Sequence, residues 1–344
     1  MRGETLEDAR FDDLALRLFE YQLRYNEPYA RYCARLGIAS APSSWDAIPA
    51  VPAAAFKSAA VSTFDASRAA LIFETSGTTA ATTGRHYMET SELYDAVLLA
   101  GFDRFVLADG ARLRYFNLVP DPRERPQSSL GYMMARVGGL RGLGPPGWYL
   151  QGGELLAERL AADLAASIAA SEPVCIATTA FALVAFLDEM ERRGLSFELP
   201  AGSRVMETGG FKGRTRIVER GELYARTCER FGIAAGAIVA EYGMTELTSQ
   251  YYDALPGRAK ASPPWLRARI VDARRSTLAD GRIGSILHVD LANRSSCIAI
   301  QTEDLGMHAA DGFVLLGRER TASPRGCSLD AEDLATRSAG AHAG

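Results

Sequence analysis

The sequence predicts an α/β fold made of parallel βαβ units, with a smaller β-rich part behind it. Between residues 69 and 240, short apolar segments typical of buried strands alternate with amphipathic segments of helical length. That alternation favours right-handed crossovers and a mainly parallel sheet. After Pro264 the helical segments end, and short strand-like segments separated by turns follow. The 344 residues can bury a large core in one large domain or two closely packed ones.

The N-terminal part begins with a helical region. Residues 6–36 carry apolar side chains at helical spacing, with charges between them. A Ser- and Pro-rich stretch, residues 40–52, ends this region and indicates a crossing loop. A short apolar strand follows at 69–73. Residues 90–107 form the next helix, with acidic side chains near its start as the helix dipole prefers.

The central part supplies the alternating elements of the sheet. Strands are predicted at 114–119, 174–177, 203–206 and 237–240, and helices at 154–170, 181–193 and 216–231, with a loop at 140–147. The β-rich part has strands at 267–272, 283–291, 298–302 and 312–316. We therefore divide the chain into an N-terminal helical segment (1–50), a core domain (51–264), a β-rich subdomain (265–334) and a frayed tail (335–344).

Composition indicates a soluble globular enzyme. Hydrophobic residues make up 47% of the chain and charged residues 23%. A formal net charge of -4 provides no basic field for nucleic acid or an anionic membrane surface. The five cysteines include no C-x-x-C pair, which argues against structural zinc and for reduced thiols. The N-terminus lacks the apolar region of a signal peptide, and no apolar stretch is long enough to span a bilayer. We therefore expect a cytoplasmic protein.

A Thr- and Gly-rich segment directly after the strand at 69–73 is the first candidate site. It reads T-S-G-T-T-A-A-T-T-G-R, from which we select Thr75, Ser76, Gly77, Thr78, Thr79, Gly84 and Arg85. Glycines let backbone N–H groups turn toward an anion, hydroxyls add donors without bulk, and the arginine adds a charged donor. A triphosphate needs such donors, although the spacing is not that of a P-loop. The alternative is a polar turn between two strands.

The second candidate follows the strand at 237–240 and reads E-Y-G-M-T-E. It comprises Glu241, Tyr242, Gly243, Met244, Thr245 and Glu246. Thr245 can bind a phosphate oxygen, and Glu246 can bind a magnesium ion that shields the triphosphate. The alternative is a plain strand-to-helix turn in which Thr245 caps the helix.

The third candidate is T-E-D-L-G, residues 302–306, followed by Gly317 and Arg318. A carboxylate at a strand end, here Asp304, can accept hydrogen bonds from both hydroxyls of a ribose. The alternative is an acidic β-turn.

In this order, the three motifs resemble those of the adenylate-forming superfamily, which includes acyl-CoA ligases, luciferase and peptide-synthetase adenylation domains. Four segments are closer to one branch: FETSGTTAATTGRHYM, ETGGFKGRTR, EYGMTELTSQYYD and RGCSL resemble the acyl-protein synthetases of bacterial luminescence. The resemblance extends from about residue 51 to about residue 334, so residues 51–264 would be an adenylation core.

The resemblance implies ATP and Mg²⁺ as cofactors and a role for each matched residue. Thr75 to Thr79 and Gly84 would form the phosphate loop, and Gly209 and Gly210 would lie along the adenine and acyl site. Tyr242 would stack near adenine, Thr245 would touch the α-phosphate, and Glu246 would bind magnesium. Asp304 would hold the ribose hydroxyls, and Arg318 would lie at the subdomain boundary.

Two departures from the superfamily pattern bear on the chemistry. The phosphate loop usually ends in Pro-Lys-Gly, where this chain has Gly84, Arg85 and His86. Most members also carry a C-terminal lid with a catalytic lysine, and here we expect the lid to be absent or vestigial. Arg85 and Lys212 would then supply the positive charge that stabilises the departing pyrophosphate. The alternative for Lys212 is a solvated loop residue.

Cys327, in P-R-G-C-S-L, is the expected acyl acceptor, because a thiolate is favoured beside Arg325. The alternative is a small residue that packs the subdomain edge. Cys175 and Cys297 lie in apolar strands and are expected in the core.

The expected reaction activates a carboxylic acid, by the resemblance a fatty acid, as an acyl-adenylate and then transfers the acyl group to a protein cysteine. The catalytic residues would be Cys327, Lys212, Arg85 and Thr245, and the partner would resemble an acyl-CoA reductase that takes the acyl group. Two alternatives stay open. One is a carboxylate–CoA ligase of the phenylacetate type, and the other is a nucleotide-binding module that has lost catalysis.

Overall fold

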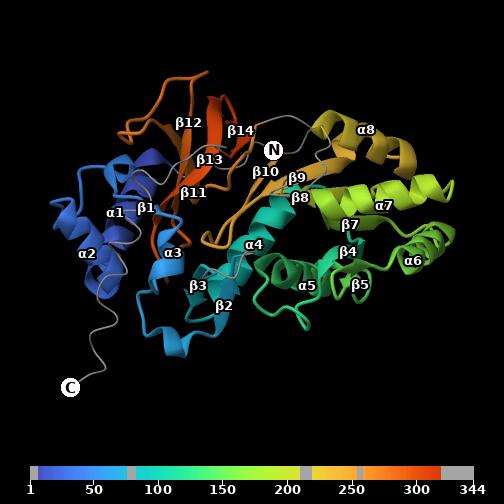
Figure 1. Ribbon diagram of the computed structural model, residues 1–344, viewed down its shortest axis with the longest axis horizontal. Helices are drawn as coiled ribbons and strands as arrows, with labels where there is room; N and C mark the ends of the chain where they lie inside the picture. The colour runs from blue at the N-terminus through green and yellow to red at the C-terminus, as the bar shows by residue number, and fades with distance from the viewer. Residues whose placement is uncertain (1–6, 76–82, 210–218, 254–258, 319–344) are drawn as a thin grey trace. The chain divides into compact units, whose positions relative to one another are not determined.

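Two compact units make up the computed structural model, which describes residues 7–75, 83–209, 219–253 and 259–318 (Figure 1). Unit 1 contains Met1–Tyr94, Met244–Ser249 and Ser262–Gly344. Unit 2 contains Asp95–Gly243 and Gln250–Ala261. The chain therefore passes repeatedly from one unit to the other.

A seven-stranded sheet runs through unit 2, in the order β10-β9-β8-β7-β4-β5-β6. Its strands are β4 (Arg114–Pro120), β5 (Gly147–Gln151), β6 (Glu154–Leu155), β7 (Val174–Thr179), β8 (Arg204–Thr208), β9 (Ile238–Tyr242) and β10 (Tyr251–Asp253). The pairs from β9 through β8, β7 and β4 to β5 are parallel, and the edge strands β10 and β6 pair antiparallel. The parallel βαβ sheet predicted from the sequence is confirmed.

Helices cover both faces of this sheet (Figure 1). They are α4 (Glu92–Phe105), α5 (Ser129–Arg141), α6 (Ala157–Ala169), α7 (Ala180–Arg192) and α8 (Arg220–Phe231), with the short 3-10 helix η3 (Ala235–Ala237). Phe116 and Leu118 of β4 belong to the core formed with α6, α7 and α8. On the other face, Tyr115 of β4 contacts Phe102 of α4, with 6.2 Å between ring centroids. Successive side chains of one strand thus serve two cores.

Unit 1 contains the β-rich part. Strands β11 (Leu266–Val271), β12 (Ile283–Asp290), β13 (Ala299–Ala309) and β14 (Gly312–Arg318) pair antiparallel in chain order, and β1 (Val51–Pro52) pairs with β13 in parallel. A separate hairpin consists of β2 (Leu71–Glu74) and β3 (Arg85–Met88). The helical elements are α1 (Asp8–Tyr25), α2 (Glu27–Arg35) and α3 (Ala55–Ser58), with the 3-10 helices η1 (Trp45–Ala47) and η2 (Ala66–Arg68).

Buried polar side chains attach the N-terminal helices to the β-rich part. Gln22 Nε2 donates to the Asn293 carbonyl at 2.7 Å, and Gln22 Oε1 accepts from the Ile298 N–H at 2.8 Å. Asn26 Nδ2 donates to the Ser296 carbonyl at 2.8 Å. The boundary proposed at residue 50 therefore does not separate these helices from the β-rich segment. Within the described ranges, no helix is both long and apolar enough to cross a membrane.

Three expected elements differ from the structure. The helical region at 6–36 is interrupted at Asn26, whose side chain accepts from the Tyr29 N–H and caps α2. Residues 129–141 form α5, so the loop expected from residue 140 begins only at Gly142. Glycines lower the helix propensity of this segment, and burial of Met133 and Met134 overrides it. Strand β13, expected to end at 302, continues to Ala309.

Candidate active site

The first motif lies at the end of the β2–β3 hairpin. Thr75 and Gly84 close this end: the Thr75 N–H donates to the Gly84 carbonyl, and the Gly84 N–H donates to Thr75 Oγ1, each at 2.9 Å. Ser76, Gly77, Thr78 and Thr79 lie outside the described residues. The alternative of a connection between two strands is therefore the local topology. Such a connection can still present hydroxyl and N–H donors to an anion.

Arg85 of this motif already has a carboxylate partner. Its Nε donates to Glu74 Oε1 at 2.9 Å across the hairpin, and its side chain is 53% exposed. The hydrogen bond with Glu74 raises the pKa of Arg85. Because Glu74 partly neutralises this positive charge, Arg85 attracts a phosphate less strongly than an unpaired arginine would.

The second motif docks on the same hairpin within unit 1. Thr245 Oγ1 donates to the Glu74 carbonyl at 3.4 Å, and the Thr245 carbonyl lies 2.9 Å from His86 Nδ1. The structure thus brings together two predicted phosphate-binding segments that are far apart in the sequence. The chain continues from Thr245 through a turn into β10, with no helix between them, so the helix-cap alternative is wrong.

His86 contacts a candidate site residue, Thr245, and was not itself selected from the sequence. Its ring is buried next to Phe56, and burial lowers the pKa of His86 to about 4. A neutral imidazole that faces a carbonyl carries its proton on Nδ1, so His86 donates to Thr245. The buried Nε2 is then an acceptor, and no described residue donates to it. His86 therefore fixes Thr245 without adding charge.

The residues after Thr245 are held by Asp290, the last residue of β12, and by Asn293, which follows it. Asn293 Nδ2 donates to the Glu246 carbonyl at 3.1 Å, and Asn293 Oδ1 accepts from the Thr248 N–H at 2.7 Å. Asp290 accepts from both the N–H and the hydroxyl of Ser249, each at 2.9 Å. Burial raises the pKa of Asp290 to about 6. These contacts fix the backbone that carries Glu246.

Glu246 is buried and is the residue predicted to bind magnesium. The described part of the chain holds no cluster of three or more His, Cys, Asp or Glu side chains suited to a metal ion. Magnesium bound with ATP commonly uses one or two protein carboxylates and takes its other ligands from phosphates and water. A single carboxylate at Glu246 fits that mode of binding and does not fit a site that holds the metal without nucleotide.

The nucleotide-binding residues predicted in unit 2 lie at the carboxyl ends of β8 and β9. Gly209 has a φ of +77°, a left-handed conformation that favours glycine. The Thr208 hydroxyl donates to the Glu241 carboxylate and so joins the two strand ends. At Gly243, an added Cβ would lie 2.5 Å from Glu241 Oε1, so a larger residue there would have to displace this carboxylate. Tyr242 is buried near Tyr251. Ligands of open parallel sheets bind at such carboxyl ends.

A buried ion pair supports the strand that carries Tyr242, and sequence reasoning missed it. Lys260 Nζ donates to the Ala240 carbonyl at 2.8 Å and lies 3.6 Å from Asp253 Oδ1, which accepts from the Ala240 N–H at 2.8 Å. Both charged side chains are 1% exposed. Burial lowers the pKa of Lys260 and raises that of Asp253, while their attraction opposes both shifts. Strand β10 ends at Asp253. The side chains of Asp253 and Lys260 therefore satisfy the N–H and the carbonyl of Ala240 in place of backbone groups of a longer strand.

The same network reaches α8. Arg220 Nη1 lies 3.6 Å from Asp253 Oδ2, and the Tyr224 hydroxyl donates to Glu207 Oε2 at 2.9 Å. Burial raises the pKa of Glu207. Glu207 opens the E-T-G-G segment, of which Gly210, like Lys212 after it, lies outside the described residues. The network therefore joins the ends of β8 and β9 to the start of α8.

The two residues of the third motif form an ion pair. Asp304 of β13 is in register with Arg318 of β14, and Arg318 Nε donates to Asp304 Oδ1 at 2.9 Å. Asp304 lies inside a strand, so both the expected strand end and the acidic turn are wrong. The polar residues 301–304 give no apolar pattern that would predict a strand, and the register with β12 is irregular at this point. A carboxylate has more acceptor sites than one arginine nitrogen uses, so ribose binding stays compatible with this pair.

Comparison with known proteins decides the family. The family model described as acyl-protein synthetase, LuxE, matches residues 154–335, which is more than half of the chain. The chain belongs to the acyl-protein synthetase family. Membership of this family makes the chain an enzyme of the ligase class. A long-chain-fatty-acid–luciferin-component ligase from Vibrio harveyi is 21% identical over 325 residues, which cover 90% of this chain and 84% of the relative.

Solved structures of adenylate-forming proteins share the fold of this acyl-protein synthetase. An open conformation of 2-hydroxyisobutyryl-CoA ligase with 2-HIB-AMP and CoA gives a TM-score of 0.69 at 13% identity, covering 93% of this chain and 76% of that one. McyG A-PCP complexed with phenylalanyl-adenylate gives 0.54 at 18% identity, covering 75% and 48%. The chain thus spans about half the length of McyG A-PCP. The adenylate-forming fold expected from the motifs is confirmed.

Three of the four described cysteines of this acyl-protein synthetase are unsuited to accept an acyl group, and the fourth, Cys228, is partly buried in α8. Cys33, Cys175 and Cys297 are buried. Burial was expected for the last two, and Cys175 lies in β7 as predicted, whereas Cys297 lies just before β13 and not in a strand. Burial raises the pKa of both Cys33 and Cys175 to about 12 and also raises that of Cys297, which disfavours the reactive thiolate. Cys327 lies outside the described residues, so its role stays a prediction.

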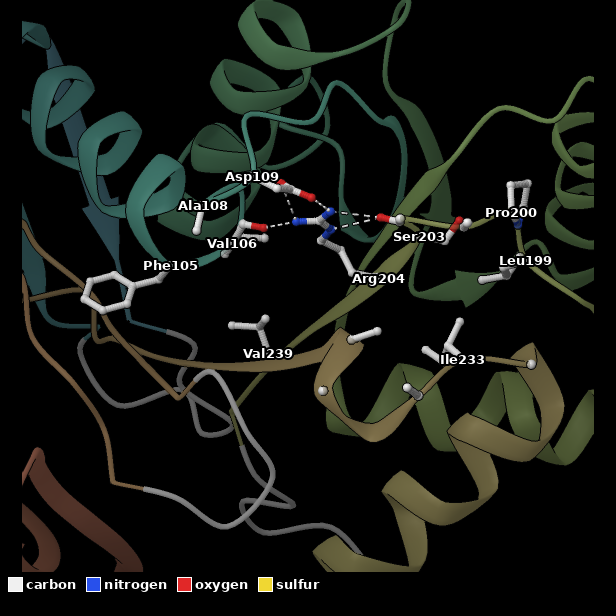
Figure 2. Close-up of a pocket in the computed structure, with 16 residues that line it drawn as sticks. Phe105, Val106, Ala108, Asp109, Leu199, Pro200, Ser203, Arg204, Ile233 and Val239 are labelled. Carbon is white, nitrogen blue, oxygen red and sulfur yellow. Dashed lines mark hydrogen bonds and ion pairs between the residues drawn. The ribbon is translucent and has the colours of Figure 1, made fainter. Parts of the chain in front are cut away.

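A pocket of about 470 Å³ lies in unit 2 at the amino ends of β8 and β9 (Figure 2). It is lined by the residues that precede β8 and β9 and by the end of α4 with the chain after it. Arg204 at its centre pairs with Asp109 at 2.8 Å and donates to the Val106 and Gly202 carbonyls. Because β8 and β9 begin at this pocket, while Gly209 and Tyr242 lie at their other ends, we exclude it as the nucleotide site.

Proposed function

We propose that this chain activates a carboxylic acid with ATP and then transfers the acyl group to a protein cysteine. The observation that carries the proposal is the docking of Thr245 on the β2–β3 hairpin, where its carbonyl lies 2.9 Å from His86 Nδ1. This contact supports a shared phosphate-binding role for the two motifs, in a family defined by acyl-protein synthetases. A long-chain fatty acid is the proposed substrate class, after the name of the Vibrio harveyi relative.

In the proposed first step, a carboxylate oxygen bonds to the α-phosphorus of ATP while the bond from that phosphorus to its bridging oxygen breaks. Acyl-AMP and pyrophosphate result, and no proton needs to move. Like charges 4 Å apart repel by about 4 kcal/mol at an effective dielectric of 20, so the site must supply positive charge and oriented donors. Thr245, held by His86, would orient the α-phosphate. Glu246 would hold magnesium, which neutralises phosphate charge when bound.

The other predicted residues would bind the nucleoside and further phosphates. Tyr242 would contact the adenine, with Gly209, Gly210, Glu241, Gly243 and Met244 shaping the backbone around it. Asp304 would accept from the ribose hydroxyls while Arg318 orients its carboxylate. Thr75 and Gly84 would carry the phosphate loop, with Arg85 and Lys212 as cationic groups.

In the proposed second step, the sulfur of Cys327 attacks the acyl carbon, and AMP leaves with the electron pair of the broken bond. The thiol proton passes to solvent. The thioester would then be taken by a partner that resembles an acyl-CoA reductase. A cytoplasmic location suits this chemistry because thiols stay reduced there.

Pyrophosphate exchange and acyl labelling test the two steps. With labelled pyrophosphate and a panel of carboxylic acids, we expect acid-dependent exchange that does not need CoA. Incubation with ATP and labelled fatty acid should leave label on the protein that neutral hydroxylamine, which cleaves thioesters, removes. In Cys327→Ser, exchange should persist while this label disappears. In the matched control Cys228→Ser the label should remain.

Three outcomes would contradict this proposal in different ways. Label that persists in Cys327→Ser rejects the proposed acceptor. Label that moves to CoA when CoA is supplied favours the carboxylate–CoA ligase. ATP binding without exchange for any acid favours a nucleotide-binding module that has lost catalysis.

A further inference from the structure

Lysine is rare in this chain, and each lysine position therefore calls for an explanation. Only three of the 38 basic residues are lysines: Lys57, Lys212 and Lys260. Lysine presents a compact, strongly hydrated point charge on a flexible stem, whereas arginine presents a planar fork of donors. The two side chains therefore bind a phosphate with different geometry. Lys260 has a structural role, since it is buried and binds Ala240 and Asp253. Lys212 lies outside the described residues, and Lys57 remains.

Lys57 lies at the root of the predicted phosphate loop. It belongs to α3, which contacts β3. A Cβ built on Gly84 would meet the Thr75 side chain at 3.2 Å and Lys57 Cγ at 3.4 Å. The lysine stem therefore packs where the hairpin end is closed by Thr75 and Gly84. Its Nζ lies only three bonds beyond Cγ.

The charge of Lys57 is not neutralised by any described residue. Its side chain is exposed, and the ion pairs and hydrogen bonds among the described side chains do not include it. The neighbouring cation, Arg85, is paired with Glu74 at 2.9 Å. His86, on the same strand, is kept neutral by burial, which lowers its pKa to about 4. Lys57 is thus a positive charge at the hairpin end without a protein partner in the described structure.

We propose that Lys57 binds the phosphates of ATP that become pyrophosphate, and that it supplies the charge which Gly84, Arg85 and His86 do not. This inference rests on the proposed function. As the bond from the α-phosphorus to the bridging oxygen breaks, negative charge develops on the departing pyrophosphate. A lysine ammonium there stabilises that charge without giving up a proton. The ligand class is a nucleoside triphosphate or inorganic pyrophosphate.

The scarcity of lysine allows a direct binding test. Reductive methylation with ¹³C-formaldehyde labels accessible lysines and the N-terminal amine and keeps their positive charge, and the buried Lys260 is protected from it. The signal that Lys57→Arg lacks is assigned to Lys57. Titration of the full chain with pyrophosphate, and separately with magnesium–ATP, should shift this signal more than that of the N-terminal amine. If the Lys57 signal stays in place while ATP binding is seen by calorimetry, the proposal fails.

Kinetics provide the second test. Lys57→Met should weaken pyrophosphate and ATP binding about tenfold or more, as expected on losing a hydrogen bond to a charged group. Lys57→Arg should retain part of the affinity. The matched control is Arg68→Met, since Arg68 is an exposed cation of unit 1 that pairs with Glu89 at 2.5 Å. Unchanged affinities in Lys57→Met would overturn the proposal, whereas absent exchange in the wild type would instead reject the proposed function.

Discussion

Asp304 pairs with Arg318 and is also the carboxylate that we propose binds the ribose. Its Oδ1 accepts from Arg318, which is about half exposed while Asp304 is mostly buried. An arginine in this position holds the carboxylate in one orientation, and hydrogen bonds to a charged group are among the stronger ones in proteins. A ribose bound here would meet an acceptor that is already oriented.

Asp304→Ala should therefore weaken ATP binding by about 1.5–3 kcal/mol, the range for hydrogen bonds to a charged group. Calorimetric titration with ATP measures this loss. The control ligand is 2′,3′-dideoxy-ATP, which lacks both hydroxyls and should bind wild type and variant alike. Arg318→Gln keeps the carboxylate and should retain most of the preference for ATP. Equal losses for the two nucleotides in Asp304→Ala would show that this carboxylate does not bind ribose.

Candidate site residues stand out in the sequence where a local motif carries them. Thr75 and Thr245 stand in short segments whose hydroxyls and glycines already suggest anion binding, and the structure brings those segments together. His86 could not be found this way, because its function depends on Thr245, 159 positions away. Lys260 could not be found either, since burial of a lysine follows from packing that no local pattern reveals.

At the scale of elements, the strands of the parallel sheet were the most predictable. Strands buried on both faces are near-continuous apolar runs, and β4, β7 and β9 have that pattern. The edge strand β10 was missed because its three residues are too short to show a period. Its end is completed by side chains, since Asp253 and Lys260 bind the N–H and the carbonyl of Ala240.

Breaking this buried pair should destabilise unit 2 strongly. Lys260→Met removes the buried charge partner of Asp253 and leaves it the partly exposed Arg220, at 3.6 Å. Loss of one member of a buried pair costs about 3–5 kcal/mol. Denaturant unfolding followed by circular dichroism measures this change. Asp253→Asn should also destabilise, and the double variant should lose less than the sum of the two. As a control, Arg68→Met removes one partner of an exposed pair and should cost no more than about 1 kcal/mol. Additive losses in the double variant would show that the two charges do not depend on each other.

At the scale of the whole molecule, the chain builds its two units from interleaved segments. Unit 1 takes Met244–Ser249 from between two segments of unit 2. Sequence reasoning assigns contiguous stretches to domains, so it could predict the α/β class but not this interleaving. The short segment bears on the proposed function because it contains Thr245 and Glu246, which we propose bind phosphate and magnesium. It is fixed by Asp290 and Asn293 of the β-rich part and by His86 of the hairpin.

Unit 1 also buries titratable groups whose pKa shifts oppose one another. Burial lowers the pKa of His288 to about 4 and raises that of Asp290 to about 6. The unfolded chain protonates His288 near pH 6.5, before the folded protein does, so the stability that His288 contributes is lost as pH falls from about 6.5 to about 4. Asp290 acts in the other direction: the folded protein takes up its proton first, so its contribution grows as pH falls from about 6 to about 4.

Two variants should separate these opposing contributions. The free energy of unfolding is measured for wild type, His288→Leu and Asp290→Asn between pH 7 and pH 4.5. Relative to wild type, His288→Leu should gain stability as pH falls, by up to about 3 kcal/mol, since it lacks the group that the unfolded chain protonates. The free energy of unfolding of Asp290→Asn should fall relative to wild type over the same range, by a similar amount. Any constant cost of lost packing or of the hydrogen bonds from Ser249 shifts each curve without changing its slope. Parallel curves for wild type and His288→Leu would mean that His288 titrates alike in the folded and unfolded protein, and that its burial does not limit stability in acid.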